Sequence, residues 1–292
     1  MSKISGIYAA SMSILNDDLT LNIKKTIKHA EMVIDNGCHG AAIFGSTGQA
    51  QLIPVSEKIG LLNQLAQSKY KEKYIIGTGL NSLGETINLM SVAKSLNFKK
   101  FLIMPPAYYK YGDKEVIEFY SKIAEAIPDS KIILYNFEKL CGYKFSIECV
   151  EKLVSKYPNN IVGVKDSSYN LFENLKIDNF SVLPGSESKL LKGLQLGCSG
   201  IITATCNATS ELARKVYDDF QNGNEQKANQ KLCDVRSAFE KYNLISGLHT
   251  YFGKNNSSYK NLLPVFLLVT LQTSLQIQKR PYLPFHLGHD VS

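Results

Sequence analysis

Short apolar runs recur along most of this 292-residue chain, and their order constrains the fold more than any other feature of the sequence. Most of them are almost continuously apolar, as in FLIM, KIILY and GIITAT, which is typical of strands buried on both faces of a parallel sheet. We expect eight such strands, at residues 6–14, 40–45, 74–80, 100–105, 131–137, 161–165, 180–184 and 200–206.

Helical patterns separate these strands. Apolar residues repeat at helical spacing over residues 23–34, and an Asn-Gly pair then predicts the end of that helix. Ser82, followed three residues later by Glu85, predicts a capped helix start, and Asp113 predicts another. The sequence therefore predicts that strands and helices alternate along the chain.

Eight strand–helix units in this order predict an α/β protein with a (β/α)8 TIM barrel and a C-terminal helical extension. A doubly wound sheet would commonly show a glycine-rich dinucleotide loop after its first strand, but here that strand runs into SILNDD. Strand signals stop after residue 207, and helical patterns follow at 210–222, 225–242 and 260–277. We expect a barrel domain over residues 1–222 and a helical region over 223–292 packed on it, because no flexible linker separates them.

The composition argues against several classes of protein. The 33 Lys and Arg residues exceed the 26 Asp and Glu residues by 7, but they form no basic block, so nucleic-acid binding is not expected. The six cysteines lack CxxC spacing and the histidines lack HxxxH or HExxH spacing, so neither a disulfide framework nor a metal site is predicted. The N-terminus does not resemble a cleaved signal, and the apolar run 262–271 is about half a membrane span and favours a buried helix. We expect a cytoplasmic protein with no membrane partner.

Lys165 is the most informative residue at a strand end. In a barrel of this type the functional groups project from the C-terminal ends of the strands, and Lys165 closes the apolar strand IVGV. Loss of solvent there favours the neutral amine, which can attack a carbonyl carbon and form a Schiff base. A strand-end lysine also commonly extends its head into solvent, and for Lys165 alone that alternative stays open.

Tyr135 ends the preceding strand and should lie beside Lys165. Its phenol could carry a proton to and from a reacting oxygen if a hydroxyl keeps it oriented. Ser46 and Thr47, in a glycine-flanked turn, could supply that hydroxyl while their backbone N–H groups bind a carboxylate. Taken separately, Tyr135 could equally be an interior tyrosine whose hydroxyl is bonded locally. Ser46 and Thr47 could equally form an ordinary turn between a strand and a helix.

Taken together, four motifs resemble a known family. GSTG follows the second strand, PPAYY follows the fourth, YN with a later glycine ends the fifth, and GVKDSS ends the sixth. This order resembles the dihydrodipicolinate synthase/N-acetylneuraminate lyase family of class I pyruvate-dependent aldolases. The resemblance extends over essentially the whole chain and includes RPYLPF near its end.

The resemblance implies a role for each matching residue. Lys165 would form the Schiff base with pyruvate or a pyruvate-derived substrate, and Tyr135 would be the general acid/base. Ser46 and Thr47 would bind the substrate carboxylate, with one hydroxyl in the proton relay. Tyr109 matches a tyrosine that family members insert into a neighbouring subunit's site, which implies at least a homodimer, and the family is commonly a homotetramer. The covalent Schiff base requires no metal or organic cofactor.

Departures from the family pattern bear on the substrate. Leu140 stands where synthases of the lysine pathway usually carry an arginine that pairs with the carboxylate of aspartate semialdehyde, and leucine cannot make that contact. Lys139 is expected to point elsewhere. Glu187 is expected at the rim of the site, where its carboxylate would accept hydrogen bonds from sugar hydroxyls, and Gly185 and Ile202 complete the expected substrate contacts.

The sequence therefore favours a 2-keto-3-deoxy sugar acid, or a similar 2-keto acid, as the substrate. The KDSS segment also resembles that of aldolases or dehydratases acting on such acids. Two alternatives stay open: a 4-hydroxy-tetrahydrodipicolinate (dihydrodipicolinate) synthase condensing pyruvate with aspartate semialdehyde, and a non-catalytic sugar-acid-binding paralogue, since a fold does not fix a function.

Overall fold

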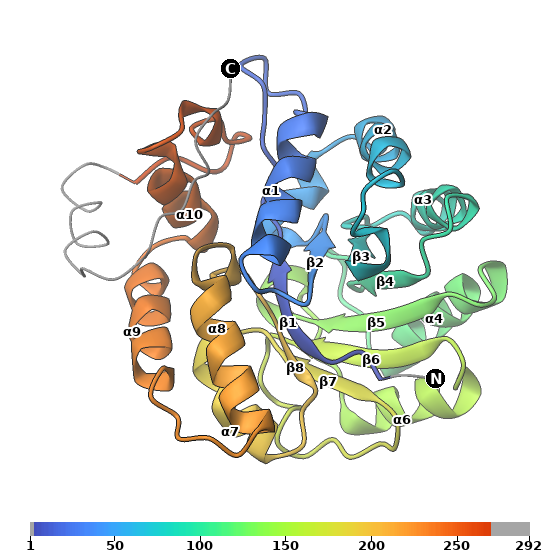
Figure 1. Ribbon diagram of the computed structural model, residues 1–292. Helices are drawn as coiled ribbons and strands as arrows, with labels where there is room; N and C mark the ends of the chain where they lie inside the picture. The colour runs from blue at the N-terminus through green and yellow to red at the C-terminus, as the bar shows by residue number, and fades with distance from the viewer. Residues whose placement is uncertain (1–2, 270–292) are drawn as a thin grey trace.

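A barrel of parallel strands forms the centre of the molecule, with helices around its outside (Figure 1). The structure is a computed structural model and describes residues 3–269. The strands are β1 (Gly6–Ala10), β2 (Gly40–Ile43), β3 (Tyr74–Gly77), β4 (Lys100–Ile103), β5 (Lys131–Asn136), β6 (Ile161–Asp166), β7 (Ser181–Pro184) and β8 (Gly200–Thr203). Their hydrogen-bonded order is β7-β6-β5-β4-β3-β2-β1-β8. The predicted eight strands and the TIM barrel are confirmed.

The ends of the sheet meet next to β8. Ser199, just before that strand, donates its backbone N–H to the carbonyl of Val182 in β7 at 2.9 Å and accepts a bond from Gly6 of β1 at 2.8 Å. Gly200 adopts a φ of +140°, and a Cβ placed there would lie 1.9 Å from the carbonyl oxygen of Gly6. Only glycine therefore allows β1 and β8 to approach closely enough to pair.

The helices follow the strands in the expected alternation except between β6 and β7. They are α1 (Ile23–Asp35), α2 (Val55–Leu65), α3 (Leu83–Ser95), α4 (Asp113–Ala126), α5 (Glu138–Cys141), α6 (Ile147–Lys156), α7 (Leu190–Gln195), α8 (Cys206–Gln221), α9 (Asn229–Glu240) and α10 (Leu244–Gly253). The predicted start of α3 is confirmed, because the Ser82 hydroxyl accepts a bond from the backbone N–H of Glu85 at 3.3 Å. α4 begins at Asp113, also as predicted.

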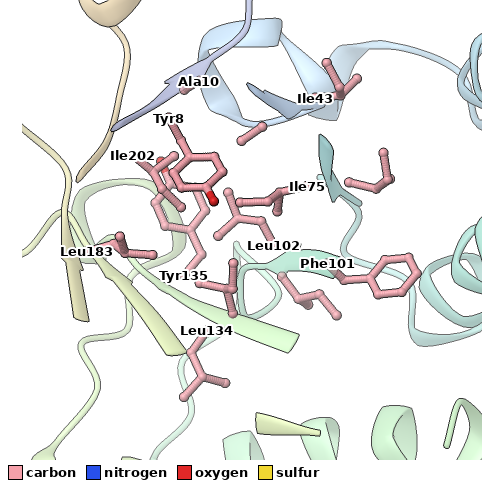
Figure 2. Close-up of a cluster of buried hydrophobic side chains, with 14 of the residues drawn as sticks. Tyr8, Ala10, Ile43, Ile75, Phe101, Leu102, Leu134, Tyr135, Leu183 and Ile202 are labelled. Carbon is pink, nitrogen blue, oxygen red and sulfur yellow. The ribbon is translucent and has the colours of Figure 1, made fainter. Parts of the chain in front are cut away.

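Side chains alternate between the interior of the barrel and the helix layer. Figure 2 shows Tyr135, Leu183 and Ile202 turned toward the interior, whereas Leu134, the neighbour of Tyr135, points the other way. Both faces are buried, which explains why the strands read as unbroken apolar runs. Position within a strand therefore decides whether a side chain can reach the mouth of the barrel.

The connection between β6 and β7 departs from the predicted alternation, because it is a loop. The carboxylate of Asp166, at the end of β6, accepts backbone N–H bonds from Tyr169, Leu171 and Phe172, each at 2.9 Å. These bonds satisfy donors that a helix would otherwise pair within itself.

The C-terminal part of the chain differs most from the sequence-based expectation. A helix over residues 260–277 was the prediction, but residues 260–269 are irregular, and the helix that the pattern missed is α10. Pro264 lacks a backbone N–H, and Val265 has a φ of +91°, so a helix cannot continue through them. Val265 is 82% exposed, so the expected burial of this segment is also wrong. The rest of that segment and the RPYLPF motif lie outside the described residues.

α9 and α10 pack on the barrel beside α8 (Figure 1). A second cluster of buried side chains joins the segment after β1 to these helices. Its members are Met12, Ile14, Ala204, Val235, Phe239, Leu248, Phe252 and Tyr259. In the part of the chain described, no helix is long and apolar enough to span a membrane.

Candidate active site

A cavity of about 1010 Å³ opens at the C-terminal ends of the strands. The strand ends contribute Gly45, Tyr135, Lys165, Gly185 and Ala204 to its wall, and residues of α5, α9 and α10 also line it. A volume of this size is at the upper end of small-molecule sites, so it can hold a substrate larger than pyruvate.

Lys165 and Tyr135 lie side by side in this cavity. They are paired residues in the register of β5 and β6, and the Lys165 ammonium lies 4.1 Å from the centroid of the Tyr135 ring. Lys165 is 3% exposed and Tyr135 is 4% exposed. Within residues 3–269 the ammonium has no carboxylate or hydrogen-bond partner, so it is available to a ligand in the cavity.

The GSTG turn (residues 45–48) supplies the next hydroxyls. Ser46 Oγ and Tyr135 OH are 2.9 Å apart, and Thr47 lines the same cavity. The turn is a short 3-10 helix, held in place by a bond of 2.7 Å from the Ser13 hydroxyl to the carbonyl of Gly48. The structure thus brings Ser46, Thr47, Tyr135 and Lys165 together.

Asn136 and Asp166 fix the strand ends that carry the tyrosine and the lysine. They follow Tyr135 and Lys165 and are paired in the same register, and Asn136 Nδ2 donates to Asp166 Oδ1 at 2.8 Å. Both side chains are fully buried. The sequence predicted no role for these two residues, although two polar residues that close adjacent apolar strands were a usable signal.

Of four further residues predicted to belong to the site, two line the cavity and two do not. Leu140 and Gly185 line the cavity, whereas Ile202 is buried in the barrel interior and Tyr109 is exposed on the surface, both outside the cavity wall. Gly185 is required by packing, because a Cβ there would lie 2.2 Å from Ser167 Oγ. Lys139, expected to point elsewhere, also lines the cavity.

Glu187 does not lie at the rim of the site. Its side chain is completely buried, and Oε2 accepts bonds from Arg236 Nη1 at 3.1 Å and from Thr203 Oγ1 at 2.8 Å. The prediction that Glu187 faces the substrate is therefore wrong. A buried carboxylate is stable only when it is paired, and Arg236 of α9 provides the opposite charge.

Sequence reasoning missed the contribution of α9 to the cavity. Arg236 and Glu240 both line it, and Arg236 Nε donates to Glu240 Oε1 at 2.7 Å. A signal was present, because Arg236 falls on the same helix face as the buried Leu232 and Phe239. An arginine within an apolar helix face needs a buried acidic partner.

Gln49, next to the GSTG turn, links the active site to the C-terminal segment. Its Oε1 accepts the backbone N–H of Leu263 at 2.9 Å, and its Nε2 lies 3.4 Å from His249 Nε2. His249 Nδ1 is 2.7 Å from the carbonyl of Tyr259, so Nδ1 carries the proton and Nε2 accepts. Burial lowers the pKa of His249 to about 4.

His29 of α1 joins the same segment. Its ring lies 2.8 Å from the Tyr259 hydroxyl and 2.7 Å from Asn207 Oδ1, and burial lowers its pKa to about 4. Across residues 3–269, no three His, Cys, Asp or Glu side chains gather as metal ligands. Both histidines therefore act in packing the C-terminal segment against the barrel.

The chain is similar in sequence to enzymes of one family. A model of the dihydrodipicolinate synthetase family matches residues 3–257. An uncharacterized DapA-like lyase of Chloroflexus aurantiacus is 29% identical over 245 residues, which cover 81% of this chain and 82% of the relative. A 4-hydroxy-tetrahydrodipicolinate synthase of Listeria monocytogenes serovar 1/2a is 33% identical over 215 residues, covering 71% of this chain and 72% of the relative.

Solved structures share the fold. Dihydrodipicolinate synthase DapA-2 of Bacillus anthracis has a TM-score of 0.87 at 22% identity and covers 96% of this chain and 98% of its own. YagE, an E. coli K12 prophage protein solved in complex with pyruvate, has a TM-score of 0.85 at 21% identity and covers 95% of this chain and 97% of its own. The match of the family model over most of the sequence shows that the chain belongs to the dihydrodipicolinate synthetase family, whose members are pyruvate-dependent lyases and aldolases.

Proposed function

We propose that this protein is a class I aldolase that cleaves or forms a 2-keto-3-deoxy sugar acid, with Lys165 as the Schiff-base residue and Tyr135 as the general acid/base. The observation that carries the proposal is the buried pair itself: an ammonium without a carboxylate partner in the described chain lies 4.1 Å from the ring of a tyrosine, and the tyrosine hydroxyl lies 2.9 Å from Ser46 Oγ. A lysine nucleophile next to an oriented proton carrier is the arrangement that this chemistry needs.

Schiff-base formation uses these groups in order. The neutral amine of Lys165 adds to the C2 carbonyl carbon of the keto acid, and one of the amine protons passes through Tyr135 to the oxygen, which gives the carbinolamine. Tyr135 then gives its own proton to that hydroxyl, water leaves, and the iminium and the Tyr135 phenolate remain. Ser46 and Thr47 bind the adjacent carboxylate through the GSTG turn, and the Ser46 hydroxyl orients Tyr135.

Carbon–carbon cleavage then follows from the iminium. Tyr135, deprotonated, takes the proton of the C4 hydroxyl, the C3–C4 bond breaks, and its electron pair moves into the iminium to give an enamine and a free aldehyde. Protonation of the enamine at C3 and hydrolysis release pyruvate and the lysine amine. Condensation is the same sequence in reverse.

Leu140 supports a sugar-acid substrate. It lines the cavity and is partly exposed, so an incoming carboxylate would meet an apolar side chain at that point. A hydroxylated aldehyde loses less binding free energy there than aspartate semialdehyde does, because the hydroxylated aldehyde carries no charge.

Lys139 favours a second candidate function. Its side chain lines the cavity next to Leu140 and could pair with the carboxylate of aspartate semialdehyde. The relative of Listeria monocytogenes named 4-hydroxy-tetrahydrodipicolinate synthase is compatible with that reaction. Under this alternative, Lys139 takes the place of the arginine that the sequence lacks at position 140.

Borohydride trapping tests the central step. We expect pyruvate and borohydride to attach one pyruvate-derived group per subunit, at Lys165, and we expect Lys165→Ala to abolish labelling and turnover. Lys192→Ala, which changes an exposed lysine of α7, is the control and should label normally. Labelling that persists in Lys165→Ala contradicts the assignment.

A panel of aldehydes and 2-keto-3-deoxy sugar acids then separates the functions. Cleavage of a sugar acid supports the aldolase, and efficient condensation with aspartate semialdehyde alone supports the synthase. Trapping without turnover of any compound would indicate a binding protein.

A further inference from the structure

Helix α9 presents a polar pair to the cavity. Arg236 and Glu240, one helical turn apart, both line it, and their side chains are 6% and 45% exposed. The reaction mechanism uses neither residue. They belong to the wall completed by the C-terminal helices, not to the strand ends that carry Lys165 and Tyr135.

Most of the hydrogen-bond donors of the Arg236 guanidinium are already bonded to other groups of the protein. Nη1 donates to Glu187 Oε2 at 3.1 Å, to Thr203 Oγ1 at 3.0 Å and to Thr205 Oγ1 at 3.3 Å, and Nε donates to Glu240 Oε1 at 2.7 Å. Within the described chain this leaves Arg236 Nη2 as a donor and Glu240 Oε2 as an acceptor without protein partners. Two neighbouring residues of the cavity wall therefore keep one donor group and one acceptor atom for a ligand.

The charge of this cluster argues against an anionic ligand. One guanidinium is shared by the carboxylates of Glu187 and Glu240, so the three groups together have one more negative than positive formal charge. A second substrate carboxylate would be repelled by Glu240 and would offer no proton to its oxygen. Arg236 is therefore not a replacement for the arginine missing at position 140.

Neighbouring hydroxyl groups match the pair. Each hydroxyl both donates and accepts, so one can accept from Arg236 Nη2 while the next donates to Glu240 Oε2. Both bonds involve a charged partner, which makes them stronger than bonds between neutral groups. We infer that Arg236 and Glu240 bind two hydroxyls of the chain beyond C4 of the substrate and so select polyhydroxylated aldehydes. This inference rests on the proposed aldolase function.

The test compares a hydroxylated aldehyde with one that has no hydroxyls. Condensation of pyruvate with D-erythrose and with butanal is measured on the unmodified protein and on Glu240→Gln. The glutamine keeps the length of the side chain, and its amide oxygen can still accept from Arg236 Nε. It then presents an N–H₂ group to the cavity in place of the acceptor oxygen.

We expect the unmodified protein to prefer erythrose over butanal, and the ratio of their kcat/KM values to fall roughly tenfold or more in Glu240→Gln. Glu225→Gln is the matched control, because it also removes one carboxylate near the start of α9 but changes a residue that is 77% exposed and outside the cavity wall. Its ratio should match that of the unmodified protein. Arg236→Lys, which keeps a charge beside Glu187, should also lower the ratio if its thermal unfolding shows a folded protein.

Two outcomes overturn the inference: no preference for erythrose in the unmodified protein, or an unchanged ratio in Glu240→Gln. An unchanged ratio that comes with an equal loss for both aldehydes would mean that Glu240 only positions α9. Pyruvate trapping at Lys165 separates these outcomes from failure of the proposed function, because it does not depend on the aldehyde.

Discussion

At the scale of single residues, the proposed function makes turnover depend on the Tyr135 hydroxyl. We expect Tyr135→Phe to lower kcat roughly 100-fold or more, the usual contribution of a positioned acid/base, because the ring and its contact with Lys165 remain while the proton carrier is lost. Steady-state assays of the cleavage reaction measure this. Tyr157→Phe, which removes a hydroxyl bonded to Glu125 away from the cavity, is the control. A near-normal rate for Tyr135→Phe would remove it from the mechanism.

We expect Leu140 to be the residue at which substrate choice can be changed. We expect Leu140→Arg to raise kcat/KM for condensation with aspartate semialdehyde by about 10-fold or more, since a charged hydrogen bond contributes about 1.5–3 kcal/mol. Leu140→Gln adds polarity without charge and should give a much smaller gain. Efficient synthesis by the unmodified protein, with no gain in Leu140→Arg, would show that another group binds the carboxylate, and Lys139 would be the first to test.

Single residues also show where sequence reasoning ends. Lys165, Tyr135 and the GSTG turn could be placed because strand ends converge in a barrel. Glu187 could not, because its partner Arg236 lies 49 positions later in the chain and nothing local reveals the pairing. The position of Ile202 depends on the alternation of side chains along its strand. An error of one residue in the strand places a side chain on the opposite face of the sheet.

At the scale of elements, the strands were predictable and the C-terminal segment was not. Each strand is buried on both faces, so its sequence alone carries the signal. The segment after α10 is held by contacts with Gln49 and His29, which are distant in sequence. The proposed boundary at residue 222 stays a prediction, because α9 shares its ion pair with the barrel.

Because His29 and His249 are buried, we expect the attachment of the C-terminal segment to be sensitive to acid. His29 and His249 have pKa values of about 4 in the fold and about 6.5 when unfolded, so the unfolded chain binds more protons between those values. Their contribution to stability is complete above about pH 6.5 and is lost as the pH falls toward 4. The upper limit is about 3 kcal/mol for each histidine, from 1.36 kcal/mol per pKa unit.

Urea unfolding at pH 7 and pH 5 measures this effect. We expect the free energy of unfolding to be lower at pH 5 than at pH 7. We expect this decrease to be smaller in His249→Asn, although that variant is less stable at pH 7. An equal loss in both proteins would mean that other groups cause the acid sensitivity.

At the scale of the whole molecule, an exposed aromatic pair predicts assembly. Tyr108 is 90% exposed and Tyr109 is 74% exposed, with their rings edge to face at 5.1 Å, and Tyr108 is held at a φ of +87°. Leaving two tyrosines in water on a strained turn is costly unless something covers them. We propose a homotetramer, or at least a homodimer, in which Tyr109 reaches the neighbouring site.

Sedimentation of the unmodified protein tests the assembly. Tyr109→Ser should weaken association and lower kcat together, whereas Leu19→Ser, which changes another exposed apolar residue, should leave both as they are. A fully active monomer would contradict the proposal.

The register of β5 and β6 has a consequence for how such an enzyme changes over time. Because Tyr135 and Lys165 are paired residues of adjacent strands, the sheet fixes their separation at about the interstrand spacing of 4.8 Å, whatever the loops do. Leu140, Arg236 and Glu240 lie on α5 and α9, outside the sheet. Under the proposed function, the covalent chemistry and the choice of aldehyde therefore lie on separate parts of the chain, so substitutions in two helices can change the accepted aldehyde while Lys165 and Tyr135 keep their positions.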